Sequence, residues 1–472
     1  MKHTPTNVPA KQSPLPEVIG VQTFVKLYDG RTVRAIQLNN AATTPPFKDT
    51  LVAVNSFLET YGALHRGAGP RARLTCERVE KAIHSIRRFT NCPDYHALIF
   101  TQNTSAAINL LARMLHLGEN DLVTTSEIEH TSNNLPWRYN SAAQVLEIRA
   151  TNSGTIDYDD LKHKCDEHGD RIKVVAVSGA SNQTGYVPNL KLISKIAHSC
   201  GAFFFVDAAQ LVPHRPVDMI ADGIDAIAFS ARKLYAPFGL GVLMLPRTLM
   251  DMIPIDPGGG SIDMISDQRI LWAPPDERHQ TGTWNVTGIV ALGSSCETMM
   301  QAGWDGIPYT ARQLASVPSI IMYVNPEQYL HEERIGTFPF NLKGIHHSLL
   351  AAILEYEYGI EVRAGTICNH RLVRRWFDIS EADQERLELK IKDGDRLATY
   401  GIVRVSLGIQ NTKEDIDYLV AALTQIASEG CRLEYRPDPT SETYEPILKR
   451  NESPLAELAY ESIERTPLTT YS

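Results

Sequence analysis

The chain has 472 residues, of which 43% are hydrophobic, and carries a formal net charge of −9. Because single hydrophobic cores stop growing at roughly 250–300 residues, this length predicts more than one domain. The negative charge argues against nucleic acid as the main partner, although an acidic protein can still hold a local cationic pocket for a small anion.

The N-terminal residues lack the pattern of a targeting segment. Residues 1–19 are polar and contain four prolines, without the apolar run of a signal peptide. No stretch of the chain reaches the roughly 20 apolar residues of a transmembrane helix. The seven cysteines are scattered, odd in number and without a C-x-x-C pair, which favours a reducing compartment and indicates no zinc site. We therefore expect a cytoplasmic protein with no membrane segment, no bound metal and an N-terminal arm over residues 1–30.

From residue 31 to about 300, short apolar runs alternate with amphipathic segments. Two of these segments predict helices over 105–117 and 190–199, each followed by a glycine that ends it. Such alternation implies a largely parallel sheet covered on both faces, so we expect one large α/β domain over 31–300. The seven predicted strands are 97–101, 122–125, 145–148, 174–178, 202–206, 226–230 and 241–245.

Beyond residue 300 the pattern changes to a mixture typical of a smaller α+β domain, which we place over 301–430. Residues 431–472 are polar and rich in Pro, Glu and Ser, which is typical of an extended tail. The elements predicted for the smaller domain are strands over 336–341, 359–363 and 402–407 and helices over 348–356 and 413–428.

Polar residues follow several strands of the large domain, where ligands bind in open α/β sheets. Thr104 and Ser105 open a helix whose free N–H groups could bind an anion, with either hydroxyl as the helix cap. An ordinary cap is the commoner meaning of this pattern. His130 follows a second strand and could stack on a planar ring and move protons, although a lone histidine is more often structural.

Asp207 and Lys233 follow two successive apolar strands. A buried carboxylate needs a cationic partner, which a protonated pyridine nitrogen would supply; an N-cap is the alternative role of Asp207. A poorly solvated lysine has a lowered pKa, so its neutral amine could form a Schiff base, whereas most lone lysines are merely solvated. The order of these groups along the chain is more specific than any one of them.

Taken in order, these segments resemble the class V, fold type I enzymes that use pyridoxal 5′-phosphate (PLP). Within that group the chain is similar to the cysteine desulfurase and selenocysteine lyase branch, from about Leu38 to Ile426. The motifs that carry the resemblance are Leu38-Asn-Asn-Ala-Ala-Thr43, Thr104-Ser105, Glu129-His130, Ser181-Asn182, Asp207-Ala-Ala-Gln210, Ser230-Ala-Arg-Lys233, Gly282-Thr283, Arg363-Ala-Gly-Thr-Ile-Cys368 and Arg404-Val-Ser406.

The resemblance implies a homodimer with a large domain around a seven-stranded, mostly parallel sheet, and it implies roles for individual residues. Lys233 would hold PLP through a Schiff base, Asp207 would pair with the pyridinium nitrogen and His130 would stack on the ring. Arg404 would bind the substrate carboxylate, a task suited to a guanidinium, and Cys368 would take sulfur from the substrate. The other implied contacts are Gln210 and Asn182 at the phenolic edge, Thr104, Ser105, Ser230 and Arg232 at the phosphate with Thr283 of the second subunit, and Asn182 and Ala41 near the substrate.

Three departures limit the transfer of roles. The segment from Gly303 to Val317 is short against the usual entry to the small domain, and we expect the charged stretch from Ser380 to Asp395 to lie over the mouth of the site. Arg232 stands where the family commonly has a histidine before the Schiff-base lysine. Thr366 and Ile367 stand where many members have two histidines before the nucleophilic cysteine.

Three functions are compatible with these residues. We expect a cysteine desulfurase that converts L-cysteine to L-alanine and leaves sulfur on Cys368 as a persulfide, with a protein sulfur acceptor as a further candidate partner. The alternative is a class V C–S lyase, epimerase or aminotransferase that forms no persulfide. These enzymes share Lys233, Asp207 and His130, so Cys368 is the residue that distinguishes the first two functions. The competing interpretation of Cys368 is structural, because a free cysteine is often only a small buried hydrophobe. A binding or regulatory protein without turnover is the third.

Overall fold

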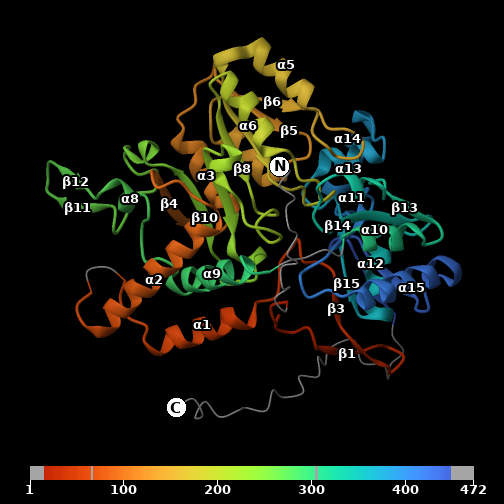
Figure 1. Cartoon of the computed structure of the whole chain (residues 1–472). Helices are drawn as coiled ribbons and strands as arrows, with labels where there is room; N and C mark the ends of the chain where they lie inside the picture. Colours follow the sequence, from red (N-terminus) through yellow and green to blue (C-terminus); the bar gives the residue numbers. More distant parts are fainter. Residues whose placement is uncertain (1–14, 65–66, 303–306, 448–472) are drawn as a thin grey trace, which may run out of the picture.

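The computed structural model describes residues 15–64, 67–302 and 307–447 (Figure 1). Its largest sheet has seven strands in the order β4-β10-β9-β8-β7-β5-β6. Only β10 runs antiparallel to its neighbours, and the remaining pairings are parallel. The seven-stranded, mostly parallel sheet is thereby confirmed, with each predicted strand present. The strands are β4 (His96–Thr101), β5 (Leu122–Ser126), β6 (Gln144–Ile148), β7 (Ile172–Ser178), β8 (Phe203–Asp207), β9 (Ala226–Ser230) and β10 (Gly241–Pro246).

Helices cover both faces of this sheet, because alternate strand residues point to opposite sides and both sets are apolar. Phe205 and Ala228 pack on one face with α3 and α4, whereas Phe204 and Ile227 pack on the other. The helices of this part of the chain are α1 (Lys48–Glu59), α2 (Pro70–Phe89), α3 (Thr104–Met114), α4 (Leu135–Tyr139), α5 (Tyr158–His168), α6 (Leu190–Ser199), α7 (Met219–Asp222), α8 (Pro275–Arg278) and α9 (Val286–Met299).

A second, antiparallel sheet has the order β13-β14-β17-β16 and lies beside the first unit (Figure 1). Val403 and Val405 face its core, so Arg404 between them points to the opposite face. The strands are β13 (Ile320–Met322), β14 (Thr337–Leu342), β16 (Arg363–Gly365) and β17 (Ile402–Ser406). The helices are α10 (Ile307–Ala315), α11 (Gln328–His331), α12 (His347–Tyr358), α13 (His370–Trp376), α14 (Glu381–Lys392) and α15 (Lys413–Glu429).

The start of the predicted large domain contributes to this second core. Strand β3 (Ile36–Gln37) pairs in parallel with β15 (Ile360–Glu361), and Ile36 and Leu38 are buried in the same apolar cluster as Val403. Such a pairing between distant segments leaves no local signal in the sequence. The segment before it forms a small hairpin, β1 (Phe24–Lys26) with β2 (Thr32–Arg34).

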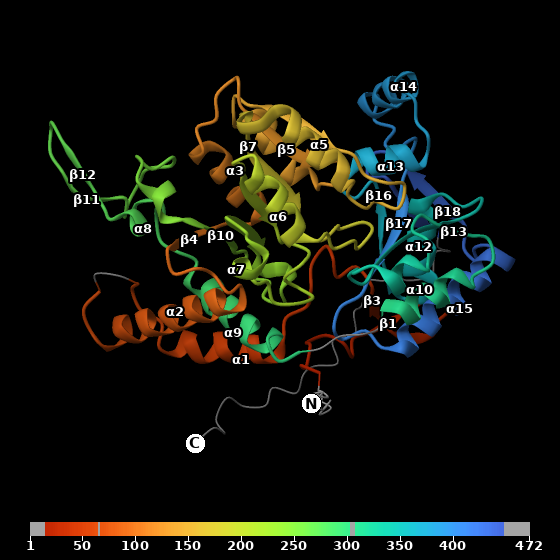
Figure 2. The same cartoon turned by 45° about the horizontal axis from the view of Figure 1, so that its top comes forward.

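Two further hairpins lie at the margins of the molecule. The hairpin of β11 (Ile262–Ile265) and β12 (Ile270–Trp272) projects from the body (Figure 2). Strands β18 (Tyr435–Asp438) and β19 (Thr443–Pro446) form the other, so the described part of the predicted tail is an ordered hairpin. Residues 1–14 of the predicted arm and 448–472 of the tail lie outside the described residues.

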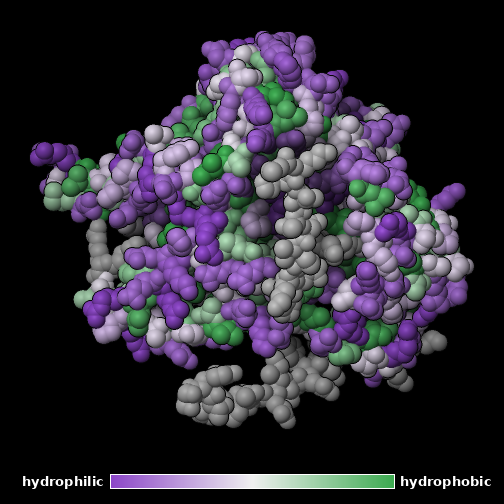
Figure 3. Space-filling view, in the orientation of Figure 1, coloured by the Kyte–Doolittle hydropathy of each residue, from purple (hydrophilic) through white to green (hydrophobic). Residues whose placement is uncertain are grey.

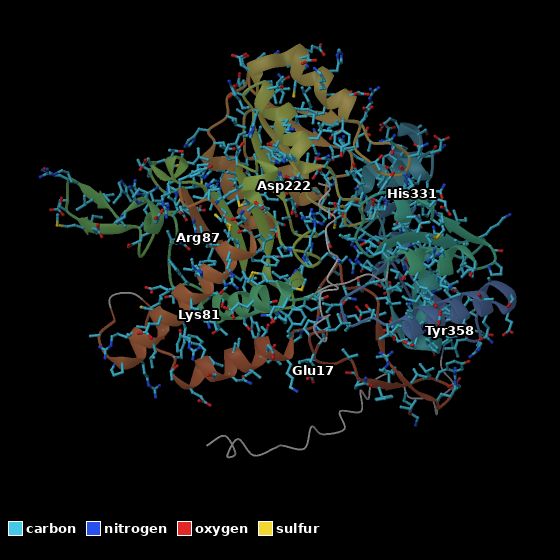
Figure 4. All side chains as sticks on the ribbon, viewed as in Figure 1. Glu17, Lys81, Arg87, Asp222, His331 and Tyr358 are labelled. Atoms are coloured by element: carbon cyan, nitrogen blue, oxygen red, sulfur yellow. The ribbon has the colours of Figure 1, made fainter. Side chains whose placement is uncertain are left out.

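Glu357 and Tyr358 at the end of α12 hold the C-terminal hairpin in place. The buried Glu357 carboxylate accepts hydrogen bonds from the backbone N–H groups of Arg432 and Leu433 and from the Tyr435 hydroxyl. The Tyr358 ring, labelled in Figure 4, lies 5.3 Å from the Arg432 guanidinium. No helix within the described ranges is long and apolar enough to cross a membrane.

Candidate active site

A cavity of about 430 Å³ opens at the carboxyl ends of the parallel strands. Nine of the predicted site residues line it, because the carboxyl ends of parallel strands meet at one edge of a sheet. These residues are Thr104, Ser105, His130, Asn182, Asp207, Gln210, Ser230, Arg232 and Lys233. Groups far apart in the sequence are therefore brought around one space.

At the α3 end of the cavity, the predicted helix cap is wrong. Asn103 is the N-cap, and its side chain accepts a hydrogen bond from the Ala106 N–H at 2.9 Å. The Ser105 hydroxyl lies 2.6 Å from that of Ser132, and the buried Thr104 Oγ1 has no hydrogen-bond partner among the described residues. Because Asn103 takes the cap, the Thr104 hydroxyl and the free N–H groups of the first turn remain available for an anion.

Asp207 and Lys233 form the charged centre of the cavity. Asp207 is 5% exposed, and its Oδ1 accepts a hydrogen bond from the Ala209 N–H at 3.0 Å. Burial raises the pKa of this carboxyl, which Lys233 partly offsets. Burial also lowers the pKa of Lys233 to about 8, against the opposing effect of Asp207. About one tenth of the amine is therefore neutral and nucleophilic at pH 7, far more than for an ordinary lysine.

His130 is held in one orientation at the cavity wall. Its Nδ1 accepts a hydrogen bond from the Ser132 N–H at 3.0 Å, so the proton of the neutral ring is assigned to Nε2. Burial, with smaller contributions from Lys233, Arg404 and Arg232, lowers the pKa of His130 to about 3. The imidazole is accordingly neutral over the physiological pH range.

A buried carboxylate behind His130 was not among the predicted site residues. Glu129 accepts hydrogen bonds from Ser126 Oγ, Ser178 Oγ and Asn133 Nδ2 at 2.5, 2.6 and 2.7 Å. Burial raises the pKa of Glu129 to about 7. The network fixes the turn that carries His130. The only sequence signal for it is the polar run from Ser126 to Asn133, which does not reveal which members meet.

Arg404 lies behind the cavity wall rather than among its lining residues, and it is 2% exposed. Its Nη1 and Nη2 donate to the Asn182 carbonyl and Asn39 Oδ1, each at 3.0 Å. Its Nε has no hydrogen-bond partner, and no carboxylate pairs with it in the described part of the chain. Burial lowers the pKa of Arg404 to about 9, with Arg363 adding to the effect. A buried cation with an unpaired donor is suited to binding a carboxylate ligand.

Ala41 joins the two sheets beside the cavity. Its carbonyl accepts a hydrogen bond from Gln210 Nε2 at 2.6 Å, and its N–H donates to Ser406 Oγ at 2.9 Å. The buried Gln210 Oε1 has no partner among the described residues. Ala41 therefore links Gln210 of the large unit to Ser406 of the Arg404 strand, and its contact with a substrate stays a prediction.

Cys368 is exposed on a tightly held loop between β16 and α13. Ile367 and Cys368 have φ values of +50° and +58°, the left-handed region that residues other than glycine and asparagine rarely adopt. Four hydrogen bonds to the large unit hold this conformation: Asn182 Nδ2 to Ile367 O (2.9 Å), Gln183 Nε2 to Thr366 O (2.6 Å), Thr131 N to Cys368 O (3.0 Å) and Asn369 Nδ2 to Ile128 O (2.9 Å).

The cations near Cys368 are not its sequence neighbours. Arg371 pairs with Glu147, and burial lowers the pKa of His370, which favours its neutral form. Instead, Lys233 and Arg404 are close enough to interact electrostatically with Cys368. Cys368 does not line the cavity, but it lies within electrostatic range of Lys233 and Arg404.

Two other predicted features lie elsewhere. Thr283 borders a separate cavity of about 380 Å³ with Gly259, Gly260 and Trp284. This placement leaves open its predicted contact with a second subunit. The charged stretch from Ser380 to Asp395, considered as a cover for the site, contains α14, which has no buried residue and contributes none to the cavity wall.

Comparisons with known proteins agree with this architecture. The model of the family described as Aminotransferase class-V matches residues 36–419. A probable cysteine desulfurase from Halalkalibacterium halodurans is 30% identical over 398 residues, covering 82% of this chain and 92% of that protein. One from Staphylococcus aureus is 30% identical over 408 residues, covering 83% and 92%.

Solved structures show the same likeness. A cysteine desulfurase from Thermococcus onnurineus NA1 superposes with a TM-score of 0.72 at 25% identity, and the cysteine desulfurase CsdA from Escherichia coli with 0.67 at 28%. Each match covers 83% of this chain and 94% of the solved one. With a fold type I architecture and a family model that spans most of its length, the chain belongs to the class-V aminotransferase family.

Proposed function

We propose that this protein is a PLP-dependent cysteine desulfurase that converts L-cysteine to L-alanine and retains the sulfur on Cys368 as a persulfide. The observation that carries the proposal is the held loop, which brings an exposed thiol within electrostatic range of Lys233 and Arg404. An accessible cysteine beside cationic groups is the setting in which this side chain acts as a nucleophile. The 30% identity to probable cysteine desulfurases over most of the chain supports the same activity.

The cavity fits PLP in both charge and hydrogen bonding. Thr104 Oγ1 and Gln210 Oε1 are buried polar atoms without a hydrogen-bond partner among the described residues, and both residues line the cavity, where a ligand would supply the partner. We assign Thr104, Ser105, Ser230 and Arg232 to the phosphate, at the N-terminus of α3. The buried Asp207 carboxyl would pair with the cationic pyridine nitrogen, and Lys233 would bond to the aldehyde carbon. The His130 ring would face the cofactor ring, and the Gln210 and Asn182 amides would lie at its edge.

When bound, PLP supplies an electron sink that stabilises negative charge on the substrate. Arg404 binds the substrate carboxylate, and its Nε–H and remaining Nη hydrogens are available for this contact. The Lys233 amine, with a pKa of about 8, gains and loses protons within the working pH range. His130 Nε2–H serves as a fixed donor.

The sulfur transfer itself is carried by Cys368. Its thiolate attacks the sulfur of the bound cysteine, so a sulfur–sulfur bond forms as the carbon–sulfur bond breaks. The β-carbon of the substrate takes up a proton, and the product leaves as alanine. The sulfur stays on the protein as Cys368–S–S⁻, so no outside oxidant is required. The persulfide must then pass to an acceptor thiol, on a protein or a small molecule.

The proposed enzyme is a homodimer. The β11–β12 hairpin projects from the body and carries exposed apolar side chains, a surface that favours burial against another copy (Figures 2 and 3). These side chains are Met264, Ile265, Ile270 and Leu271. Thr283 would then reach the phosphate of the second subunit. Sedimentation of the active holoprotein tests this assembly, and a fully active monomer would refute it.

Incubation of the holoprotein with L-cysteine tests the activity. We expect equal amounts of alanine and protein-bound or released sulfur, with the first equivalent on Cys368 by peptide mass spectrometry. Pyruvate with ammonia, or an oxo acid from transamination, would instead indicate the C–S lyase or aminotransferase that shares Lys233, Asp207 and His130.

A further inference from the structure

The hairpin of β18 and β19 lies beyond residues 36–419, the segment that the family model matches. It packs beside α12, where the Tyr444 ring lies 5.8 Å from that of His346 (Figure 2). The Glu357 carboxylate fixes the chain just before it, through the N–H groups of Arg432 and Leu433. The hairpin is therefore an ordered element packed beside α12, outside the segment that the family model matches.

The tip of this hairpin contacts both ends of the segment that connects Cys368 to Arg404. On the return side, the Arg396 N–H donates to the Pro439 carbonyl at 3.0 Å, and Thr399 Oγ1 donates to Glu442 Oε1 at 3.4 Å. On the outgoing side, Glu442 Oε1 lies 3.3 Å from the position of a β-carbon on Gly365. Gly365, with φ +103°, ends β16 three residues before Cys368. The Glu442 carboxylate thus lies between the end of β16, which leads to the thiol, and the turn before β17, which leads to the guanidinium.

The backbone at Glu442 indicates that its side chain matters. Its φ of +59° lies in the left-handed region, where turns of this length favour glycine or asparagine. A glutamate in this conformation carries local backbone strain, and its carboxylate accepts the hydrogen bond from Thr399.

Charge reinforces the contact. Arg363 is paired in register with Arg404 across β16 and β17, so their side chains share the face of the sheet that is turned away from the core. Burial raises the pKa of Glu442, and Arg363 and Arg396 act in the opposite direction. Glu442 is therefore a counter-charge for a cation beside Arg404.

We propose that Glu442 is a positioning residue for Cys368 and Arg404, holding both ends of the segment between them from the C-terminal hairpin. The inference rests on the proposed function, since it assigns these two residues as nucleophile and carboxylate ligand. Sulfur attack requires the thiol at a set distance from a substrate that Arg404 anchors, and displacements of about 1 Å are costly in such steps.

Two variants of the full-length holoenzyme test this role against a matched control. Glu442→Ala removes the hydrogen bond, the Gly365 contact and the charge, whereas Glu442→Gln removes the charge alone. Glu445→Gln is the control, because Glu445 is an exposed residue of the same hairpin that pairs with Arg436. The measurements are hydrogen exchange of peptides spanning 363–370 and 396–401, iodoacetamide labelling of Cys368 with the exposed Cys431 as reference, and KM and kcat for cysteine.

We expect Glu442→Ala to exchange faster in both peptides, to change the labelling rate of Cys368 but not of Cys431, and to lose about fivefold in kcat/KM. A similar loss in Glu442→Gln assigns the effect to charge, and a loss in Glu442→Ala alone assigns it to the contacts. The proposal is overturned if both variants match Glu445→Gln in exchange, labelling and kcat/KM. Because exchange and labelling do not need turnover, they remain readable even if the wild type produces no alanine.

Discussion

Replacement of Arg404 by lysine separates a substrate-binding role from a structural one. Nη1 and Nη2 of Arg404 already hold the Asn182 carbonyl and Asn39 Oδ1, while Nε has no partner. Lysine keeps the positive charge but lacks the planar guanidinium that can donate two hydrogen bonds to one carboxylate. The substitution therefore removes about one charge-assisted hydrogen bond, of about 1.5–3 kcal/mol. At about 1.4 kcal/mol per factor of ten, KM for cysteine should rise about 10- to 150-fold.

Steady-state sulfide release in the presence of a thiol reductant measures this change, with cysteamine as the comparison substrate because it lacks a carboxylate. Arg404→Lys should lower kcat/KM for cysteine but leave the slower reaction of cysteamine almost unchanged. Arg113→Lys is the control variant, since Arg113 forms an exposed pair with Asp256. If KM for cysteine changes less than about twofold, or both substrates lose the same factor, Arg404 serves the structure and not the carboxylate.

Three further predictions address other parts of the molecule. In cofactor-free protein, the rate of PLP attachment to Lys233 should rise with pH through about 8 and level off above it, because burial lowers the pKa of the amine that must be neutral to react; a rise centred near 10 would contradict this. Cys368→Ala should keep the cofactor absorbance but lose alanine and persulfide formation about 100-fold or more, whereas Cys431→Ala, at the other strongly exposed thiol, should not; full turnover in Cys368→Ala would refute the desulfurase. Glu357→Gln should reduce the hydrogen-exchange protection of the Arg432 and Leu433 amides by about 1–3 kcal/mol, because an amide N–H₂ group replaces one acceptor of their hydrogen bonds; unchanged protection would show that the hairpin is held by other contacts.

The large sheet and its cavity were predictable because their signals are local. Apolar runs of four or five residues, separated by amphipathic segments, predict a largely parallel sheet, and only β10 departs from that direction. The polar residues that follow those runs had to meet at the carboxyl edge of the sheet, and Asp207, Lys233 and His130 do so. Family motifs in the same order then indicated the chemistry without any knowledge of distances.

Only the tertiary structure showed which residues contact segments that are distant from them along the chain, and which of two adjacent residues takes a given role. Asn103, and not Thr104 or Ser105, caps α3, because adjacent residues compete for a cap and the backbone geometry chooses between them. The cations near Cys368 are Lys233 and Arg404, more than 30 residues away along the chain, whereas its neighbour Arg371 is paired with Glu147. Strand β3 crosses to the second sheet, and Glu442 reaches Gly365 from the C-terminal hairpin. The sequence alone determined the strands of the large sheet and which of their ends carry reactive groups, but not the three hairpins. The contacts between distant segments depended on how the two sheets pack, since periodicity reports the face that a residue presents but not the partner that meets it.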